Sequence, residues 1–354
     1  MIRIDAGRRR FLTGGIATFG LGATAALGQQ AAPAPPAKTR IDVHHHYIPP
    51  FHADIMESKR SSGRPPKWTP QMSLDEMDKS GIATAIVSLV QPGGWFEDDV
   101  PLSRRLAREC NDYGAKMMAD HPGRFGLFAA VAPPDPDGSL KEIEYVFDTL
   151  KADGVGLLTS YGDIWLGDAK LQPVFDELNR RRAIVYTHPT EATCCHTLLP
   201  NTQPGTVEWN TDTGRSIYSV LADGIQGRGT PSAASRYSNV SFIWSHGGGT
   251  LLGLVGRFGL GDPDALANPP ANSRLAQLRK FFFDTAGSAN PVTMQALKAL
   301  VGASQIVYGT DYPFGGTNGP SNIVRNLQRS GFSAAELAGV ERENALRILP
   351  KYRT

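Results

Sequence analysis

Short apolar segments alternate with helical patterns along most of this chain, and this alternation constrains its fold more than any other feature. The segments with strand character are Arg40–His46, Ala83–Leu89, Phe125–Val131, Val155–Ser160, Ala183–His188, Val240–His246, Phe281–Ala286 and Ile306–Asp311. Helical patterns occur at Gln71–Ser80, Ser103–Asp120, Gly138–Ala152, Lys170–Arg182, Thr213–Gly227, Arg274–Lys280, Pro291–Val301, Ser321–Arg329 and Glu341–Leu349. Strands separated by helices form parallel sheets, and eight such strands predict a single α/β domain, the (β/α)8 or TIM barrel.

The main alternative is an open, doubly wound sheet, which places a glycine-rich phosphate-binding turn after its first strand. Here the first predicted strand ends in three histidines, His44–His46, followed by Tyr-Ile-Pro-Pro, and the closed barrel is therefore favoured. Its longest strand-to-helix connections include Tyr47–Pro70 and Pro189–Asp212, which we expect to form the rim of the site. A net charge of +2 with no basic cluster in the body of the chain gives no reason to expect nucleic-acid binding.

The first residues resemble an export signal. Arg8–Arg10 precede Phe-Leu-Thr and a mildly apolar stretch, Gly14–Leu27, a pattern similar to a twin-arginine signal peptide. We predict a cleavable signal peptide over residues 1–28, a Pro/Ala-rich linker over 29–38 and the barrel over 39–354. The mature chain would then be periplasmic or secreted, with no membrane attachment after cleavage. The alternative is an uncleaved, disordered basic tail.

Three cysteines leave at least one thiol unpaired within the chain in an oxidising compartment. Cys110 falls in a helical pattern and is expected in the core. Cys194 and Cys195 are adjacent and lack the two-residue spacing of a zinc site. We expect them to have a structural role in a loop near the functional site.

Histidine or aspartate stands at the end of four predicted strands. These residues are His44 and His46 in the first strand, His188 in the fifth, His246 in the sixth and Asp311 in the eighth. Alternation along a strand places His44 and His46 on one face and His45 on the other. Any one of these histidines could be a buried, hydrogen-bonded residue. Together they predict a metal site at the carboxyl ends of the strands, where barrel enzymes keep their chemistry.

These residues lie in motifs that resemble the amidohydrolase superfamily, and more narrowly its branch typified by aminocarboxymuconate-semialdehyde decarboxylase. The motifs are Asp42-x-His44-x-His46, His188, His246-x-Gly248-Gly249 and Gly309-x-Asp311-Tyr312-Pro313, and the resemblance covers nearly all of Thr39–Tyr352. It implies that His44, His46, His188 and Asp311 hold one divalent metal ion, zinc in most of this branch, with manganese as the alternative. It also implies that His246 and Asp311 are the catalytic groups. The predicted fourth strand lacks the lysine that bridges two metals in binuclear relatives, so a single ion is expected.

Such a site serves two reactions: hydrolysis of a lactone, ester or amide, and non-oxidative decarboxylation. The stretch Phe283–Gly287 with Asn290-Pro291 resembles enzymes of salicylate-type acids, including 6-methylsalicylate decarboxylases. We therefore favour a metal-dependent carboxy-lyase whose substrate is a small aromatic or unsaturated carboxylic acid, with a hydrolase as the alternative. Candidate substrate contacts are Trp209, Arg215, Arg64 and Asp284. The resemblance also implies a homodimer. A periplasmic binding protein would not require converging metal ligands, and a degenerate barrel would be expected to lack one of them.

Overall fold

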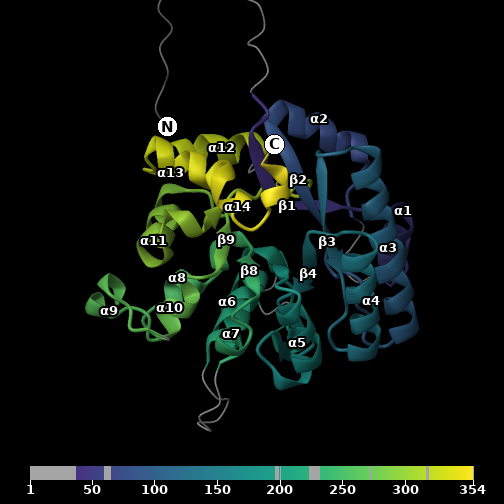
Figure 1. Cartoon of the computed structure of the whole chain (residues 1–354), viewed down its shortest axis with the longest axis horizontal. Helices are drawn as coiled ribbons and strands as arrows, with labels where there is room; N and C mark the ends of the chain where they lie inside the picture. Colours follow the sequence, from purple (N-terminus) through teal and green to yellow (C-terminus); the bar gives the residue numbers. More distant parts are fainter. Residues whose placement is uncertain are drawn as a thin grey trace, which may run out of the picture. The chain divides into compact units, whose positions relative to one another are not determined.

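Eight parallel strands form a sheet in which strands adjacent in the barrel order are also consecutive along the chain (Figure 1). The computed structural model describes residues 37–59, 65–195, 199, 201–222, 232–271, 273–315 and 319–353. The barrel strands are β1 (Arg40–Tyr47), β2 (Ile82–Leu89), β3 (Phe125–Ala130), β4 (Gly154–Leu158), β7 (Ile184–His188), β8 (Ser241–Trp244), β9 (Phe282–Asp284) and β10 (Ile306–Val307). The predicted signal peptide, most of the predicted linker and Arg64 lie outside the described residues.

The first and last strands meet and nearly close the barrel. The Val43 N–H donates to the Tyr308 carbonyl at 3.0 Å, and the His46 N–H donates to the Tyr312 carbonyl at 2.8 Å. His45 and Tyr312 form an isolated parallel bridge at the same seam. The predicted TIM-like α/β barrel is confirmed.

Helices cover the outside of the barrel, and Figure 1 shows α3, α4 and α5 outside the strands. The helices are α1 (Pro50–Lys59), α2 (Pro70–Ser80), α3 (Val100–Asp120), α4 (Pro136–Asp148), α5 (Gln172–Arg180), α6 (Glu208–Leu221), α7 (Ala233–Arg236), α8 (Leu251–Leu254), α9 (Pro263–Ala267), α10 (Arg274–Leu278), α11 (Pro291–Val301), α12 (Pro320–Gln328), α13 (Ala334–Ala338) and α14 (Asn344–Leu346). A two-stranded hairpin, β5 (Ser160–Tyr161) with β6 (Ile164–Trp165), follows β4. Across the described ranges, no helix is both long and apolar enough to span a bilayer.

Two apolar clusters hold the barrel together. The larger packs the strands against the surrounding helices. The smaller includes Val43, Phe128 and Tyr186 from the strands and Leu346 and Leu349 from the C-terminal segment. The C-terminal segment therefore packs against the same cluster as these strand residues.

Two predicted loops contain helices, which corrects the sequence-based expectation. The first connection includes α1, whose His52 and Met56 are buried. The connection after His188 ends early because α6 begins at Glu208, so Trp209 lies on a helix rather than in a loop. Helix α6 is stabilised by an amphipathic pattern that buries one face, including Ile217 and Val220.

Candidate metal centre

Three of the four predicted ligands cluster with His246, which we predicted as a catalytic group. One ligand atom from each of His44, His188, His246 and Asp311 lies within 4.8 Å of the others. The fifth group, His46, belongs to the same cluster. Its Nε2 is 3.2 Å from Nε2 of His44 and 3.1 Å from Oδ1 of Asp311.

The backbone turns sharply at two of these residues. Strand β8 ends two residues before His246, and β10 ends four residues before Asp311. We predicted both residues at the ends of their strands, but both lie beyond them. Both adopt left-handed backbone conformations, with φ of 53° at His246 and 60° at Asp311. This region is unfavourable for residues with a Cβ and is typical of functional sites. The turns direct both side chains toward the strand-end histidines.

All four imidazoles of the cluster direct Nδ1 away from its centre. Nδ1 of His44 is 2.7 Å from Asp284 Oδ2, and Nδ1 of His46 is 3.3 Å from the Ser88 carbonyl. Nδ1 of His188 lies 2.9 Å from the Pro189 carbonyl, and Nδ1 of His246 lies 3.0 Å from the Ala286 carbonyl. A carbonyl or carboxylate oxygen can only accept, so each Nδ1 carries the hydrogen.

In each neutral imidazole, Nε2 therefore carries no hydrogen and presents a lone pair. Four lone pairs and the Asp311 carboxylate face one another without enough hydrogens to share. This is the arrangement in which proteins hold a divalent cation, with the outer hydrogen bonds fixing the tautomers. The residues present fit one metal ion.

The electrostatics of the protein without a cation agree with this interpretation. Burial opposes charge on His44, yet the carboxylates of Asp284 and Asp311 outweigh it and raise the pKa of His44 to about 10. Burial holds the pKa of His188 well below its ordinary value and also lowers that of His46. Burial disfavours the ionised form of Asp311, but the charge of His44 and hydrogen bonds from two histidines hold its pKa well below the ordinary value. In the protein without a cation, a proton on His44 thus provides the positive charge beside these carboxylates, and a bound metal ion would take the place of that proton.

We predicted Asp284 as a substrate contact, but the structure places it behind His44. Its side chain is fully buried, and Oδ2 accepts from His44. Oδ1 accepts from the backbone N–H groups of His246 and Ala286 at 2.8 and 3.0 Å. Both oxygens are therefore occupied in orienting the ligand set, behind His44 rather than on the open side of the site.

A second buried carboxylate, Asp42, lies on β1 itself. Its Oδ1 accepts from the His44 N–H and its Oδ2 from Nδ1 of His45, both at 3.0 Å. Nε2 of His45 is 2.9 Å from the hydroxyl oxygen of Ser73, which also accepts from the Trp68 indole at 2.9 Å. His45 therefore faces α2 and not the metal site, as strand alternation predicts.

A small open space adjoins His188. It is lined by Ser88, Leu89, Pro92, Gly93, Gly94, Trp95, Ala130, Val131, Gly156, Leu157, Leu158, Tyr161, Tyr186 and His188. The walls are mostly apolar, and none of these lining residues is an arginine, lysine or carboxylate. Sequence reasoning missed Tyr186, although its position two residues before His188 on the same strand was a usable signal.

Aromatic residues border the ligands. The Trp209 ring centroid is 5.8 Å from that of His188, and its buried Nε1 has no hydrogen-bond partner among the described residues. The Phe314 ring centroid is 5.5 Å from that of His46, and Phe314 is 40% exposed. Trp209 therefore has a place consistent with the predicted substrate contact.

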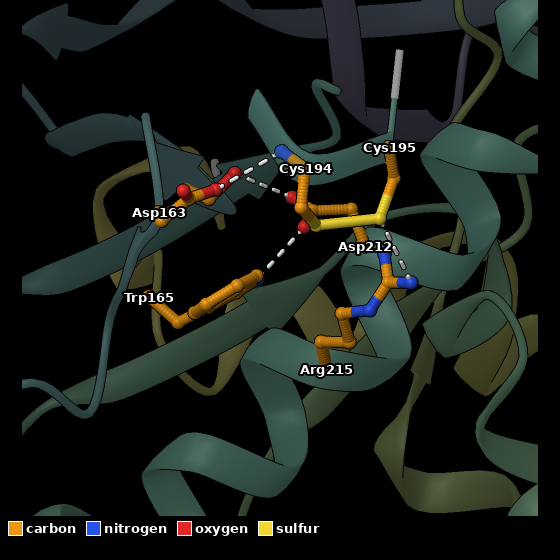
Figure 2. The surroundings of a disulfide bond; sticks show 7 residues. Asp163, Trp165, Cys194, Cys195, Asp212 and Arg215 are labelled. Atoms are coloured by element: carbon orange, nitrogen blue, oxygen red, sulfur yellow. Dashed lines mark hydrogen bonds between the residues drawn. A yellow bond between two sulfur atoms is a disulfide. The ribbon is translucent and has the colours of Figure 1, made fainter. Parts of the chain in front are cut away.

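Arg215 contacts a cysteine pair instead. Its Nη2 lies 3.5 Å from Sγ of Cys195, and Cys195 forms a disulfide with Cys194 (Figure 2). The Cys194 N–H donates to Asp163 Oδ1 at 3.2 Å. Cys110 is free and buried, as expected.

This fold and this ligand set define a barrel enzyme with a metal centre at the carboxyl ends of its strands. Residues 41–351 match the amidohydrolase family, to which the chain belongs. It is 35% identical over 334 residues to decarboxylase yanB of Aspergillus niger, covering 88% of each chain. It is also 35% identical over 298 residues to 6-methylsalicylic acid decarboxylase of Penicillium expansum, covering 80% of this chain and 87% of that protein.

Solved structures share the barrel. A dihydroxybenzoic acid decarboxylase from Polaromonas sp. JS666, solved with manganese and 2-nitroresorcinol, superposes with a TM-score of 0.73. It is 19% identical, and the match covers 90% of this chain and 98% of that one. At this identity the likeness concerns the fold.

Proposed function

We propose that this protein is a metal-dependent carboxy-lyase that removes carbon dioxide from a single-ring aromatic acid of the 6-methylsalicylate type. The observation that carries the proposal is the convergence of four imidazole lone pairs and one carboxylate beside an apolar space. The relatives that share 35% of its residues are named as decarboxylases, one of them for 6-methylsalicylic acid. Their names favour decarboxylation over hydrolysis.

The lining of the space supports a small aromatic substrate. Its walls include Trp95, Leu158 and Tyr161, and apolar and aromatic walls are typical of sites that bind a ring. None of the lining residues that the structure describes is a permanent cation, and an ion bound at the cluster would supply positive charge for the substrate carboxylate. A methyl group on the ring would meet apolar neighbours on the wall.

We assign His44, His46, His188 and Asp311 to one divalent ion, zinc or manganese, and His246 and Asp311 to catalysis. A bound ion would supply positive charge for the substrate carboxylate and its neighbouring hydroxyl oxygen. Asp311 would accept the hydroxyl proton of the arriving acid.

Asp311 then returns a proton to the ring carbon that bears the carboxylate. The bond between that carbon and the carboxylate breaks, its electrons restore the aromatic ring, and carbon dioxide leaves. His246, whose Nδ1–H donates to the Ala286 carbonyl, would stabilise the negative oxygen in its doubly protonated form, in which Nε2 also donates. Trp209 can donate its unpartnered indole N–H to a substrate oxygen.

We also propose export by a twin-arginine signal over residues 1–28, a linker over 29–38 and a mature homodimeric barrel over 39–354, periplasmic or secreted. Arg8 and Arg9 support the export route, and the first barrel strand begins at Arg40. Amino-terminal sequencing of the protein recovered outside the cytoplasm tests this: a start near Gln29 is expected. A mature protein beginning at Met1 would contradict it.

The reaction is tested with metal-loaded protein and a panel of 2-hydroxybenzoates carrying isotopically labelled carboxyl groups, beside a panel of lactones. We expect labelled carbon dioxide from the 6-methyl compound and no acid release from the lactones. Lactone hydrolysis without carbon dioxide release would overturn the assignment and leave the fold and metal site intact.

A further inference from the structure

Cys194 and Cys195 stand on the connection between β7, which ends in the ligand His188, and α6, which carries Trp209. The two sulfur atoms are joined as a disulfide between adjacent residues (Figure 2). Neither residue belongs to the ligand set or to the lining of the apolar space. The proposed reaction therefore leaves this pair unused.

The two sulfurs have unequal surroundings. Cys194 is exposed, whereas Cys195 is partly buried. The guanidinium of Arg215 contacts Sγ of Cys195, with Nη2 at 3.5 Å. On the other side, the carboxylate of Asp163 accepts from the backbone N–H of Cys194. Positive charge thus lies against one sulfur and negative charge near the other residue.

We propose that Cys194–Cys195 is a reversible redox site, reduced by an external dithiol that attacks Cys194 and expels Cys195 as a thiolate. Exposure makes Cys194 the sulfur that an attacking thiolate can reach. Arg215 stabilises the negative charge that develops on Cys195, and a stabilised thiolate is the better leaving group. The exposure of Cys194 and the contact of Cys195 with Arg215 therefore determine which sulfur is attacked and which one leaves.

The step balances with the dithiol as the reductant. Its first thiolate forms a bond to Sγ of Cys194 while the bond between the two cysteine sulfurs breaks, which leaves a mixed disulfide and the Cys195 thiolate. Its second thiolate attacks its own partner sulfur and releases Cys194. Two electrons pass to the protein, the dithiol becomes a cyclic disulfide, and the two cysteines take up two protons. A disulfide-bearing oxidant reverses the sequence.

The first test counts thiols in the air-oxidised full-length protein, denatured in an alkylating reagent and mapped by mass spectrometry. We expect Cys110 alone to be alkylated before treatment, and all three cysteines after dithiothreitol. Removal of the reductant and addition of an oxidised dithiol should restore the first pattern. Alkylation of Cys194 and Cys195 in the untreated protein would overturn the proposal.

The second test addresses Arg215. With dithiothreitol in excess, the Arg215→Gln variant should be reduced about tenfold more slowly than the wild type, because a charge-assisted contact to the leaving sulfur is lost. Arg329→Gln, which removes an exposed arginine after α12, is the matched control and should be reduced at the wild-type rate. Arg215→Lys should recover part of the rate, which a merely structural role for the arginine would not predict. Equal rates of reduction in the Arg215→Gln and Arg329→Gln variants would contradict the assignment of Cys195 as the leaving sulfur stabilised by Arg215. None of these readouts depends on the reaction proposed for the metal centre.

Discussion

The carboxylate of Asp42 holds Thr310 by two hydrogen bonds across the seam where the barrel closes. Oδ1 accepts from the Thr310 N–H at 3.1 Å, and Oδ2 accepts from its hydroxyl at 2.6 Å. Oδ1 also accepts from the His44 N–H. One buried side chain therefore fixes both the segment that carries His44 and the residue directly before Asp311, although these ligands come from opposite ends of the barrel domain.

Replacing this carboxylate should weaken metal binding. We expect Asp42→Asn to lower metal affinity by about tenfold or more, since groups that orient ligands commonly contribute 10- to 100-fold. Thr310→Val, which removes only the hydroxyl contact, should cause a smaller loss. Affinity is measured by competition with a chromogenic chelator, with Asp264→Asn on exposed α9 as the control. Unchanged affinity in Asp42→Asn protein with normal thermal unfolding would contradict this role.

Metal affinity should rise with pH because the proton on His44 competes with the cation. Asp284 and Asp311 raise the pKa of His44 in the metal-free protein to about 10, against burial that opposes the charge. Below that pKa, displacement of one proton predicts roughly tenfold tighter binding per pH unit. The Asp284→Asn variant should lose much of this dependence above neutral pH, because the main charge that stabilises the proton is gone. Affinity titrations between pH 6 and 9, an interval of about three units, give the two slopes. Identical slopes would show that Asp284 does not control the His44 proton.

His246 and His188 should separate into different roles. For His246→Ala we expect near-normal metal content and a loss of activity of about 100-fold or more, the scale of acid–base groups. For His188→Ala we expect lower metal content, because one ligand is removed. Metal analysis and initial rates on the same preparations provide the comparison. Metal loss in His246→Ala protein would instead make His246 a ligand.

The fold should lose stability in mild acid partly through His52. Burial, against a weaker opposing effect of the bond to Gly93, lowers the pKa of His52 to about 4, from 6.5. Its Nε2 donates to the Gly93 carbonyl at 2.9 Å, and its buried Nδ1 has no partner among the described residues. The unfolded chain therefore binds a proton at a pH where the folded chain does not.

The contribution of neutral His52 is complete above about pH 6.5 and is lost as the pH falls toward about 4, a change of about 3 kcal/mol. His52→Gln keeps a donor for Gly93 and should flatten this part of the stability profile. Chemical unfolding of the metal-loaded protein between these limits measures the difference. A wild-type curve of stability against pH that runs parallel to that of His52→Gln would contradict this role of His52.

The barrel and the clustering of its strand-end residues could be predicted because they depend on local patterns. Each strand is a short apolar run, and strand alternation alone separates His44 and His46 from His45. What could not be predicted depends on contacts between distant segments. Asp284 was placed wrongly because nothing local shows that its oxygens face Nδ1 of His44 and the turn at His246.

The start of α6 could not be predicted from the local sequence either. Its first turn contains Trp209 beside polar residues, and it becomes a helix because the following face packs against the barrel. The left-handed turns at His246 and Asp311 likewise have no pattern of their own in a sequence, except for the glycines that follow His246. Export and the dimer remain predictions.

The most direct test of the metal centre is removal and return of the ion in purified protein. Elemental mass spectrometry should find one zinc or manganese per chain. Chelation should abolish release of carbon dioxide from 6-methylsalicylate, and readdition of the ion should restore it. Folded protein that contains no metal, or that keeps its full rate after the ion has been removed, would contradict the account.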